Sequence, residues 1–284
     1  MPELPEVETV CAGLKPALEG QKLVGIEQRR KDLRFPLPIN FEATLSGKVV
    51  KAVRRRAKFI LIHLDGGFVL MIHLGMSGRI TIYPNDVPPP GRHDHIEFIT
   101  EKGVTIRYCD PRRFGFMDLV PASSYIEHPM ISHLGPEPLT DDFDVTSFNN
   151  KLNGRKIPIK NALLDQRIVA GLGNIYACEA LFKARISPKR IAHSIPGKRS
   201  KRLVAAIKEV LHDAITAGGS SLKDFAGTDG NLGYFQTQWA VYGRAGEKCH
   251  TICCGPDKKW HCEHVIKRIV QSGRSTFYCS KCQR

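Results

Sequence analysis

The crowding of cysteines at the C-terminal end constrains the fold of this 284-residue chain more than any other feature. Six of the nine cysteines fall between Cys249 and Cys282, and the last two form the sequence Cys279-Ser280-Lys281-Cys282. Ahead of that pair lie a β-rich run at 265–270, a turn at 271–274 and a second β-rich run at 275–278. A hairpin closed at its base by thiolates is typical of zinc ribbons, so we predict one structural Zn²⁺ here.

The residues alone leave the other half of this metal site open. Four cysteines compete for the two upstream ligand positions: Cys249, Cys253, Cys254 and Cys262. Three histidines add possible nitrogen ligands: His250, His261 and His264. The remaining cysteines lie among apolar or strand-like neighbours, and we expect them to be reduced core residues: Cys11, Cys109 and Cys178.

Charge and hydropathy restrict the class of partner. The chain has 42 Lys and Arg against 28 Asp and Glu, a net charge of +14, which favours a polyanion such as nucleic acid. An anionic membrane is the rival partner, but no basic amphipathic helix with a bulky apolar face is evident. No apolar run is long enough to span a bilayer and no signal peptide is evident, so we expect a cytoplasmic protein without membrane contact.

Hydrophobic patterning predicts an α+β chain. Residues 5–14 have the spacing of a buried helical stripe, and β-rich runs separated by glycine turns fill 22–120, including 58–64 with 68–74 and 95–100 with 104–108. We expect these strands to form a β-sandwich. A Pro- and Asp-rich junction at 134–144 precedes predicted helices at 159–169, 174–185 and 198–217. We therefore divide the chain into 1–131, a β-sandwich domain; 132–237, a helical domain; and 238–284, a zinc hairpin.

The N-terminal sequence Met1-Pro2-Glu3-Leu4-Pro5-Glu6-Val7-Glu8 carries a possible nucleophile. Removal of Met1 would leave Pro2 as a secondary amine, and α-amino groups have a pKa of roughly 8, so this amine would often be free near neutral pH. It could attack a sugar C1′ and form an iminium, with Glu3 moving the required proton. The alternative is structural, because a proline and acidic residues also favour the start of a helix.

Other motifs place cations, glycines and exposed apolar residues in turns. Lys58 ends a basic run, His73 and Met76 lie where a strand gives way to a turn, and Arg112 and Phe114 lie in Asp110-Pro111-Arg112-Arg113-Phe114-Gly115. An exposed Met or Phe beside Arg is what a wedge between bases needs. Gly171-Leu172-Gly173-Asn174 precedes a predicted helix, with Asn174 expected to cap it and the helix start able to bind a phosphate.

Together these motifs resemble the bacterial formamidopyrimidine-DNA glycosylase family over nearly the whole chain. The matching segments are 2–9, the Arg-Ala-Lys ending at Lys58, 73–78, 93–95, 110–115, 171–177, 241–244 and 273–276 with the final cysteine pair. Members of that family remove oxidised purines such as 8-oxoguanine and formamidopyrimidines and then cut the strand. The resemblance implies a bifunctional DNA glycosylase and AP lyase of base excision repair, with a helix-two-turn-helix DNA-binding domain. It also implies a monomer that acts on damaged double-stranded DNA in the bacterial cytoplasm, associated with the nucleoid.

The resemblance also implies residue roles. Pro2 would be the Schiff-base nucleophile, Glu3 its acid/base partner, Lys58 a proton donor in β-elimination and Arg274 the finger arginine linked to δ-elimination and phosphate binding. The positions that match backbone contacts are His73, His93, Arg155, Asn174 and Tyr242. The positions that match gap-filling residues are Met76, Arg112 and Phe114. Glu6 matches a carboxylate near the pocket, and 220–236 matches the loop over the flipped base.

One departure from the family pattern concerns the zinc ligands. The context of Cys249 matches the usual first ligand and that of Cys262 the second, which indicates an insertion at 250–261 that carries Cys253 and Cys254. We predict Cys249, Cys262, Cys279 and Cys282 as ligands, with Cys253 or Cys254 able to replace Cys249.

Three alternatives stay open from the sequence. The related endonuclease VIII type shares Pro2 and Glu3 but prefers oxidised pyrimidines, whereas Leu4 and 76–78 favour the purine branch. A zinc-dependent, non-catalytic DNA-binding protein would explain the charge and the cysteines but leaves Pro2 and Glu3 without a task. A thiol redox protein would use only the clustered cysteines.

Overall fold

The structure is a computed structural model that describes residues 1–220, 239–254 and 259–284, without the side chains of 252–254 and 259–261. The described residues divide into two compact units. The first unit holds 1–132 and 214–220, and the second holds 133–213 and the described residues from 239 onward. Both helices and antiparallel sheets are present, which confirms the α+β class. The division into three domains at 131 and 237 stays a prediction.

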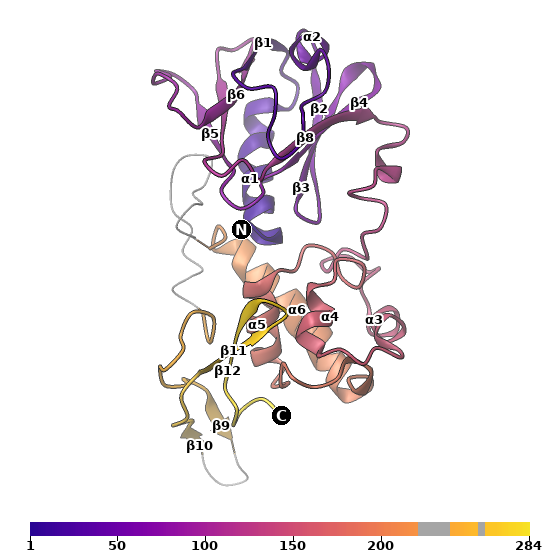
Figure 1. Ribbon diagram of the computed structural model, residues 1–284, viewed down its shortest axis with the longest axis vertical. Helices are drawn as coiled ribbons and strands as arrows, with labels where there is room; N and C mark the ends of the chain where they lie inside the picture. Colours follow the sequence, from indigo (N-terminus) through magenta and orange to yellow (C-terminus); the bar gives the residue numbers. More distant parts are fainter. Residues whose placement is uncertain (221–238, 255–258) are drawn as a thin grey trace. The chain divides into compact units, whose positions relative to one another are not determined.

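The first unit is a sandwich of two antiparallel sheets (Figure 1). Their strand orders are β2-β3-β4-β8 and β1-β6-β7-β5. The strands are β1 Leu23–Gln28, β2 Val50–Arg56, β3 Phe59–Leu64, β4 Phe68–His73, β5 Arg79–Tyr83, β6 Asp94–Thr100, β7 Thr105–Cys109 and β8 Phe116–Pro121. The short helical elements are α2 Phe41–Leu45, η1 Asp65–Gly67 and η2 Tyr125–Glu127. Nearly every residue of β3 and β4 is buried, because both faces of that sheet are covered, as their almost continuous apolar character predicts.

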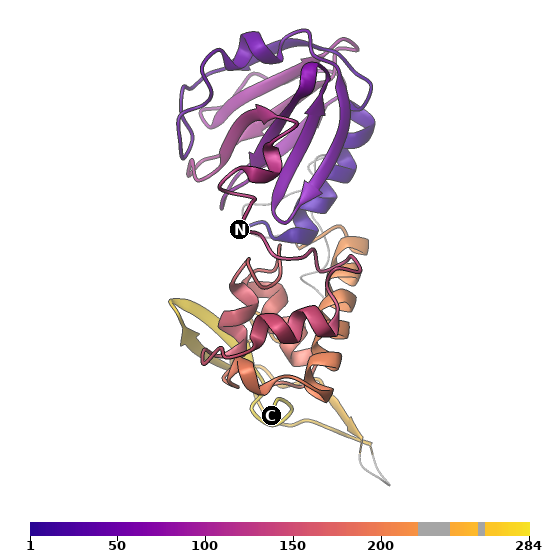
Figure 2. The ribbon, with the colours of Figure 1, turned by 90° about the vertical axis from the view of Figure 1, so that its right-hand side faces the viewer.

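Helix α1, Leu4–Leu18, packs against this sandwich (Figure 2). Glu3 is its N-cap, and Pro5 stands in the first turn, where a missing N–H costs no hydrogen bond. The predicted stripe is buried, since Val7, Val10 and Leu14 join the core formed with the strands. The N-terminal segment is thereby fixed to the sandwich.

The second unit contains four helices and a 3-10 turn among its described residues, although residues 214–216 at the end of α6 are assigned to the first unit. They are α3 Val145–Leu152, α4 Ile159–Leu164, α5 Asn174–Lys183, η3 Ala192–Ser194 and α6 Lys198–Thr216. The helix predicted at 159–169 is too long: it ends at Leu164, because Asp165 leaves helical geometry and its carboxylate accepts the Arg167 N–H at 3.1 Å. Over the part of the chain that is described, no helix combines the length and apolar character needed to cross a bilayer.

The C-terminal hairpin consists of β11 Lys267–Gln271 and β12 Arg274–Tyr278, as predicted. Its turn has positive φ at Ser272 and Gly273, the conformation that suits a two-residue hairpin loop. The predicted insertion contains a further pair of strands, β9 Ile252–Cys254 and β10 Lys259–His261, which pair antiparallel.

Candidate active site and zinc centre

The N-terminal motif lies buried at the start of α1. Pro2 is buried behind an exposed Met1, and Glu3 is only 3% exposed. The Glu3 N–H donates to Glu6 Oε2 at 2.8 Å, and the Glu3 carboxylate accepts the Glu6 N–H in return. The structural and the chemical interpretations of this motif are therefore compatible, because Glu3, which starts the helix, is also a buried carboxylic acid directly after Pro2 in the chain.

Glu6 ties the helix to a distant segment. Its fully buried carboxylate accepts the Ser220 N–H at 2.9 Å through Oε1, while Oε2 accepts from Glu3. Gly219 has φ +78 and passes close to Glu6. Ser220 begins the segment predicted to cover the flipped base, of which 221–236 lies outside the described residues. Glu6 thus fixes the point where that segment begins.

Lys58 lies in the turn between β2 and β3 and is 7% exposed, so the strand begins one residue later than predicted. Ala57 before it has φ +51, a left-handed conformation that is uncommon for a residue with a Cβ. The Arg55 guanidinium donates to the Ala57 carbonyl at 3.1 Å and to Glu8 of α1 at 2.6 Å. Arg55 therefore holds the Lys58 turn against α1, a long-range role that no local sequence signal announces.

His73 ends β4 and lies opposite Phe59 in the sheet. Its Nδ1 accepts the Gly75 N–H at 3.0 Å, so a neutral ring carries its proton on Nε2. Burial, followed by the nearby Lys58 and Arg34 charges, lowers the pKa of His73 to about 4. His73 is therefore a neutral N–H donor at physiological pH, which is compatible with a phosphate contact.

The three predicted gap-filling residues occupy two chain crossings between the sheets. Residues 74–78 lead from β4 to β5, and residues 110–115 lead from β7 to β8. Met76 and Phe114 are exposed to 38% and 44%, large fractions for apolar side chains. The Arg112 guanidinium lies 4.9 Å from the centre of the Phe114 ring. Both crossings thus present what a wedge requires.

The remaining predicted DNA-contact residues are distributed over both units. His93 is half-buried beside β6 in the first unit, and Arg155 in the second unit donates to the Lys151 carbonyl at 2.7 Å. Arg274 is exposed next to the hairpin turn. Tyr242 is half-buried, and the centroid of its ring lies 5.0 Å from that of the Phe277 ring.

Asn174 differs from the expectation that it caps α5. The N-cap is Gly173, and Asn174 is the first helical residue. Its side-chain amide instead donates to the Ser275 carbonyl of β12 at 2.8 Å, and Asn161 of α4 donates to Ser272 Oγ at 2.8 Å. These two amides fasten the hairpin to the helices, a connection between distant residues that the sequence does not reveal.

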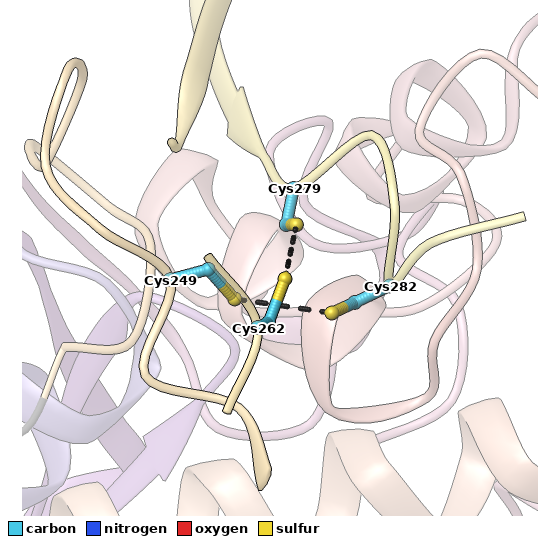
Figure 3. Close-up of side chains that lie close together, drawn as sticks. All are labelled: Cys249, Cys262, Cys279 and Cys282. Atoms are coloured by element: carbon cyan, nitrogen blue, oxygen red, sulfur yellow. Dashed lines mark hydrogen bonds between the residues drawn. The ribbon is translucent and has the colours of Figure 1, made fainter. Parts of the chain in front are cut away.

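The predicted zinc ligands converge. The ligand atoms of Cys249, Cys262, Cys279 and Cys282 all lie within 4.8 Å of one another (Figure 3). The sulfurs of Cys249 and Cys282 are 3.9 Å apart, and those of Cys262 and Cys279 are 3.7 Å apart. Zn–S bonds near 2.3 Å in a tetrahedron place sulfurs about 3.8 Å apart, so the four thiolates fit one structural Zn²⁺. The side chains of Cys253 and Cys254 lie outside the described residues.

Comparison with known proteins covers all three regions. Residues 1–117 match the family model of the formamidopyrimidine-DNA glycosylase N-terminal domain, residues 134–226 that of its H2TH domain, and residues 261–284 a zinc finger found in FPG and IleRS. The chain is 52% identical over 294 residues to the formamidopyrimidine-DNA glycosylase of Rhodospirillum centenum, with 100% of both chains covered.

Solved structures agree with the sequence comparison. The MutM (Fpg) protein of Thermus thermophilus superposes with a TM-score of 0.86 at 40% identity, over 99% of this chain and 98% of that one. A MutM complex with DNA containing carbocyclic 8-oxo-G superposes with a TM-score of 0.86 at 34% identity, over 100% of both chains.

Proposed function

This chain belongs to the formamidopyrimidine-DNA glycosylase family, and from that premise we propose that it excises oxidised purines through the amine of Pro2 and then cuts the strand. It is a DNA glycosylase of base excision repair, and AP lyase activity is typical of the family. The observation that carries the proposal is a buried Pro2 followed directly in the chain by the buried Glu3, the N-cap of α1. The family name and Leu4 favour oxidised purines over oxidised pyrimidines.

The chemistry begins once Met1 is removed. The Pro2 nitrogen forms a bond to C1′ of the lesion nucleotide, the glycosidic bond breaks, and the base departs with a proton. The C1′–O4′ bond of the sugar then opens as O4′ takes up a proton, which leaves an iminium between the Pro2 nitrogen and C1′. Glu3 supplies and removes protons at the sugar in these steps. The resulting iminium acidifies C2′, so loss of a C2′ proton expels the 3′ phosphate, and a second elimination expels the 5′ phosphate. Lys58 donates a proton in the first elimination, and Arg274 assists the second.

Access to C1′ requires that the nucleotide leave the stack, at a cost of a few kcal/mol. Met76, Arg112 and Phe114 fill the space that it leaves, and their exposure supports this role. The backbone is held by contacts to phosphate and sugar. Residues assigned to these contacts are His73, His93, Arg155, Asn174 and Tyr242. Glu6 anchors the segment that would cover the flipped base.

The structural Zn²⁺, when bound, cross-links the base of the finger hairpin and takes no part in the reaction. The four cysteines therefore stabilise the position of Arg274 by holding the strand that contains it. We further propose that the protein acts as a monomer in the bacterial cytoplasm, on damaged nucleoid DNA.

Cyanoborohydride trapping tests the proposal. On duplex containing 8-oxoguanine, a covalent protein–DNA adduct should form, and peptide mapping should locate it at Pro2. Duplex containing thymine glycol should trap less efficiently, since an endonuclease VIII type would show the reverse preference. The Glu3→Gln variant should form far less adduct.

Two outcomes would contradict the proposal. Protein that retains Met1 yet cleaves damaged duplex at full rate would exclude Pro2 as the nucleophile. Abasic DNA that is bound but left whole would indicate a non-catalytic DNA-binding protein.

A further inference from the structure

Asp110 is a fully buried carboxylate at the first position of the second sheet crossing. It follows β7 directly and precedes the exposed residues Arg112 and Phe114. A buried charge is costly unless hydrogen bonds satisfy it, so the hydrogen-bond partners of Asp110 show which segments it holds together.

Side-chain bonds of Asp110 reach both crossings. Oδ1 accepts the Ser77 hydroxyl at 2.5 Å, and Oδ2 accepts the Gly115 N–H at 2.7 Å and the Tyr108 hydroxyl at 3.2 Å. The Ser77 oxygen in turn accepts the Arg112 N–H at 3.1 Å. One carboxylate thus links Ser77, the residue after Met76, to Gly115, the residue after Phe114, and Ser77 extends the link to Arg112.

The main chain of Asp110 extends this connection to His93. The Asp110 N–H donates to the His93 carbonyl at 3.0 Å. The Asp110 carbonyl accepts from His95 Nε2 at 2.9 Å. Three segments assigned to DNA contact therefore meet at a single residue.

The two crossings are also in tight steric contact. A Cβ on Gly75 would lie 2.3 Å from the Phe114 carbonyl carbon, and a Cβ on Gly115 would lie 1.7 Å from the Tyr108 hydroxyl. Burial and the Asp110 charge raise the pKa of Tyr108 well above its usual value, so this hydroxyl keeps its proton and remains a donor. The crossings cannot shift separately without breaking these contacts.

We propose that Asp110 is a positioning residue that joins the Met76 turn and the Arg112–Phe114 turn into one preorganised wedge for the gap left by the flipped nucleotide. The inference rests on the gap-filling role assigned above. Preorganisation matters because ordering of flexible turns during insertion would oppose flipping, and small misplacements near a reacting centre lower rates steeply.

The test compares substrates that do and do not need the wedge. The Asp110→Asn variant keeps the shape of the side chain but sets an NH₂ group against the donors that surround it. We expect it to lose about tenfold or more in excision of 8-oxoguanine from duplex. Its lyase activity and borohydride trapping on a single-stranded abasic oligonucleotide should remain near wild type, since that substrate has no stack to fill.

A spectroscopic measurement reports insertion directly. With 2-aminopurine next to the lesion, the fluorescence rise on flipping should be slower in Asp110→Asn. The matched control is Asp118→Asn, which removes a half-buried carboxylate of β8 that contacts His128. This control should excise and flip at wild-type rates.

Further variants separate the possible failures. If Asp110→Asn does not fold, Ser77→Ala removes only the bridge between the turns and should still slow duplex excision selectively. Wild-type excision and flipping by Asp110→Asn, or by Ser77→Ala in its place, would overturn the inference. Equal losses on duplex and single-stranded DNA would also overturn it, because they indicate a general structural role. Wild-type duplex excision by both Met76→Ala and Phe114→Ala would refute the gap-filling role itself.

Discussion

His73 gives the N-terminal unit a specific dependence on acidity. Its pKa is about 4 in the folded protein against 6.5 for an unperturbed histidine, so the unfolded state binds more protons between these values. The contribution of His73 to stability is therefore complete above pH 6.5 and is lost as the pH falls towards 4. A shift of this size corresponds to at most about 3 kcal/mol.

The His73→Asn variant should remove that dependence, since an amide oxygen can accept the Gly75 N–H and does not titrate. Urea unfolding of both proteins at several pH values between 7 and 4 measures the effect. The stability advantage of wild type should shrink as the pH falls. The exposed His193 supplies a control, made as His193→Asn, for the loss of a histidine away from the β4 site. A constant difference for His73→Asn would contradict the assigned protonation state.

Some functional residues could be identified from the sequence alone, and others could not. Pro2, Lys58 and Arg274 could be identified because each lies within a short recognisable motif. Arg55 and Asp110 could not, because their importance comes from partners distant in the chain, such as Glu8 and Ser77. Local patterns carry no information on such pairings.

Glu179 of α5 organises the chain that leads into the zinc finger. It is 5% exposed, and its carboxylate accepts N–H groups from Ala240, Val241 and Tyr242 at 2.8 to 3.0 Å. Burial raises the pKa of Glu179, and the three backbone bonds oppose that rise. We expect Glu179→Gln to lower the free energy of unfolding by about 1–3 kcal/mol, because its NH₂ group faces donors.

Urea unfolding measures the stability that Glu179 contributes. DNA affinity tests whether Glu179 also positions Tyr242, which is assigned to a DNA-backbone contact and lies in the same segment. Glu209 of α6 provides the matched control: it is 58% exposed and paired with Lys183, so Glu209→Gln should change stability by about 0.5 kcal/mol or less. Equal, small effects of the two substitutions would show that the buried carboxylate does not hold the segment.

The cysteine cluster of the zinc finger allows a separate prediction, which concerns the residues that bind the metal. Native mass spectrometry should find one zinc per chain in wild type, Cys253→Ser and Cys254→Ser, and a loss of zinc in Cys249→Ser and Cys282→Ser. Cys249 and Cys282 supply two of four clustered sulfurs, and four thiolates complete the tetrahedral coordination of Zn²⁺. Zinc loss on substitution of Cys253 or Cys254 would change the ligand assignment.

Helices and strands were predictable to different degrees. The strands at 59–64 and 68–73 could be predicted because long apolar runs are separated by a glycine turn. The helix at 159–164 is shorter than the sequence predicts. The apolar pattern continues to Val169, but the Asp165 carboxylate accepts hydrogen bonds from Arg167, and the helix ends before them. Helix α3 was not predicted, since its start depends on a polar capping box at Asp144 and Ser147 within a segment that resembles a linker.

The net charge of +14 predicts the salt dependence of DNA binding. Each cation that neutralises a phosphate contributes roughly −0.9 to the slope of log affinity against log salt. The exposed Arg274 is assigned to phosphate, so Arg274→Ala should reduce the magnitude of the slope on duplex with an abasic-site analogue by about 1. Arg30 is also a surface cation but is already paired with Asp32 at 2.8 Å, so Arg30→Ala should leave the slope unchanged. Fluorescence anisotropy titrations between about 50 and 200 mM KCl give all three slopes. Parallel lines for wild type and Arg274→Ala would mean that the finger arginine makes no ionic contact with DNA.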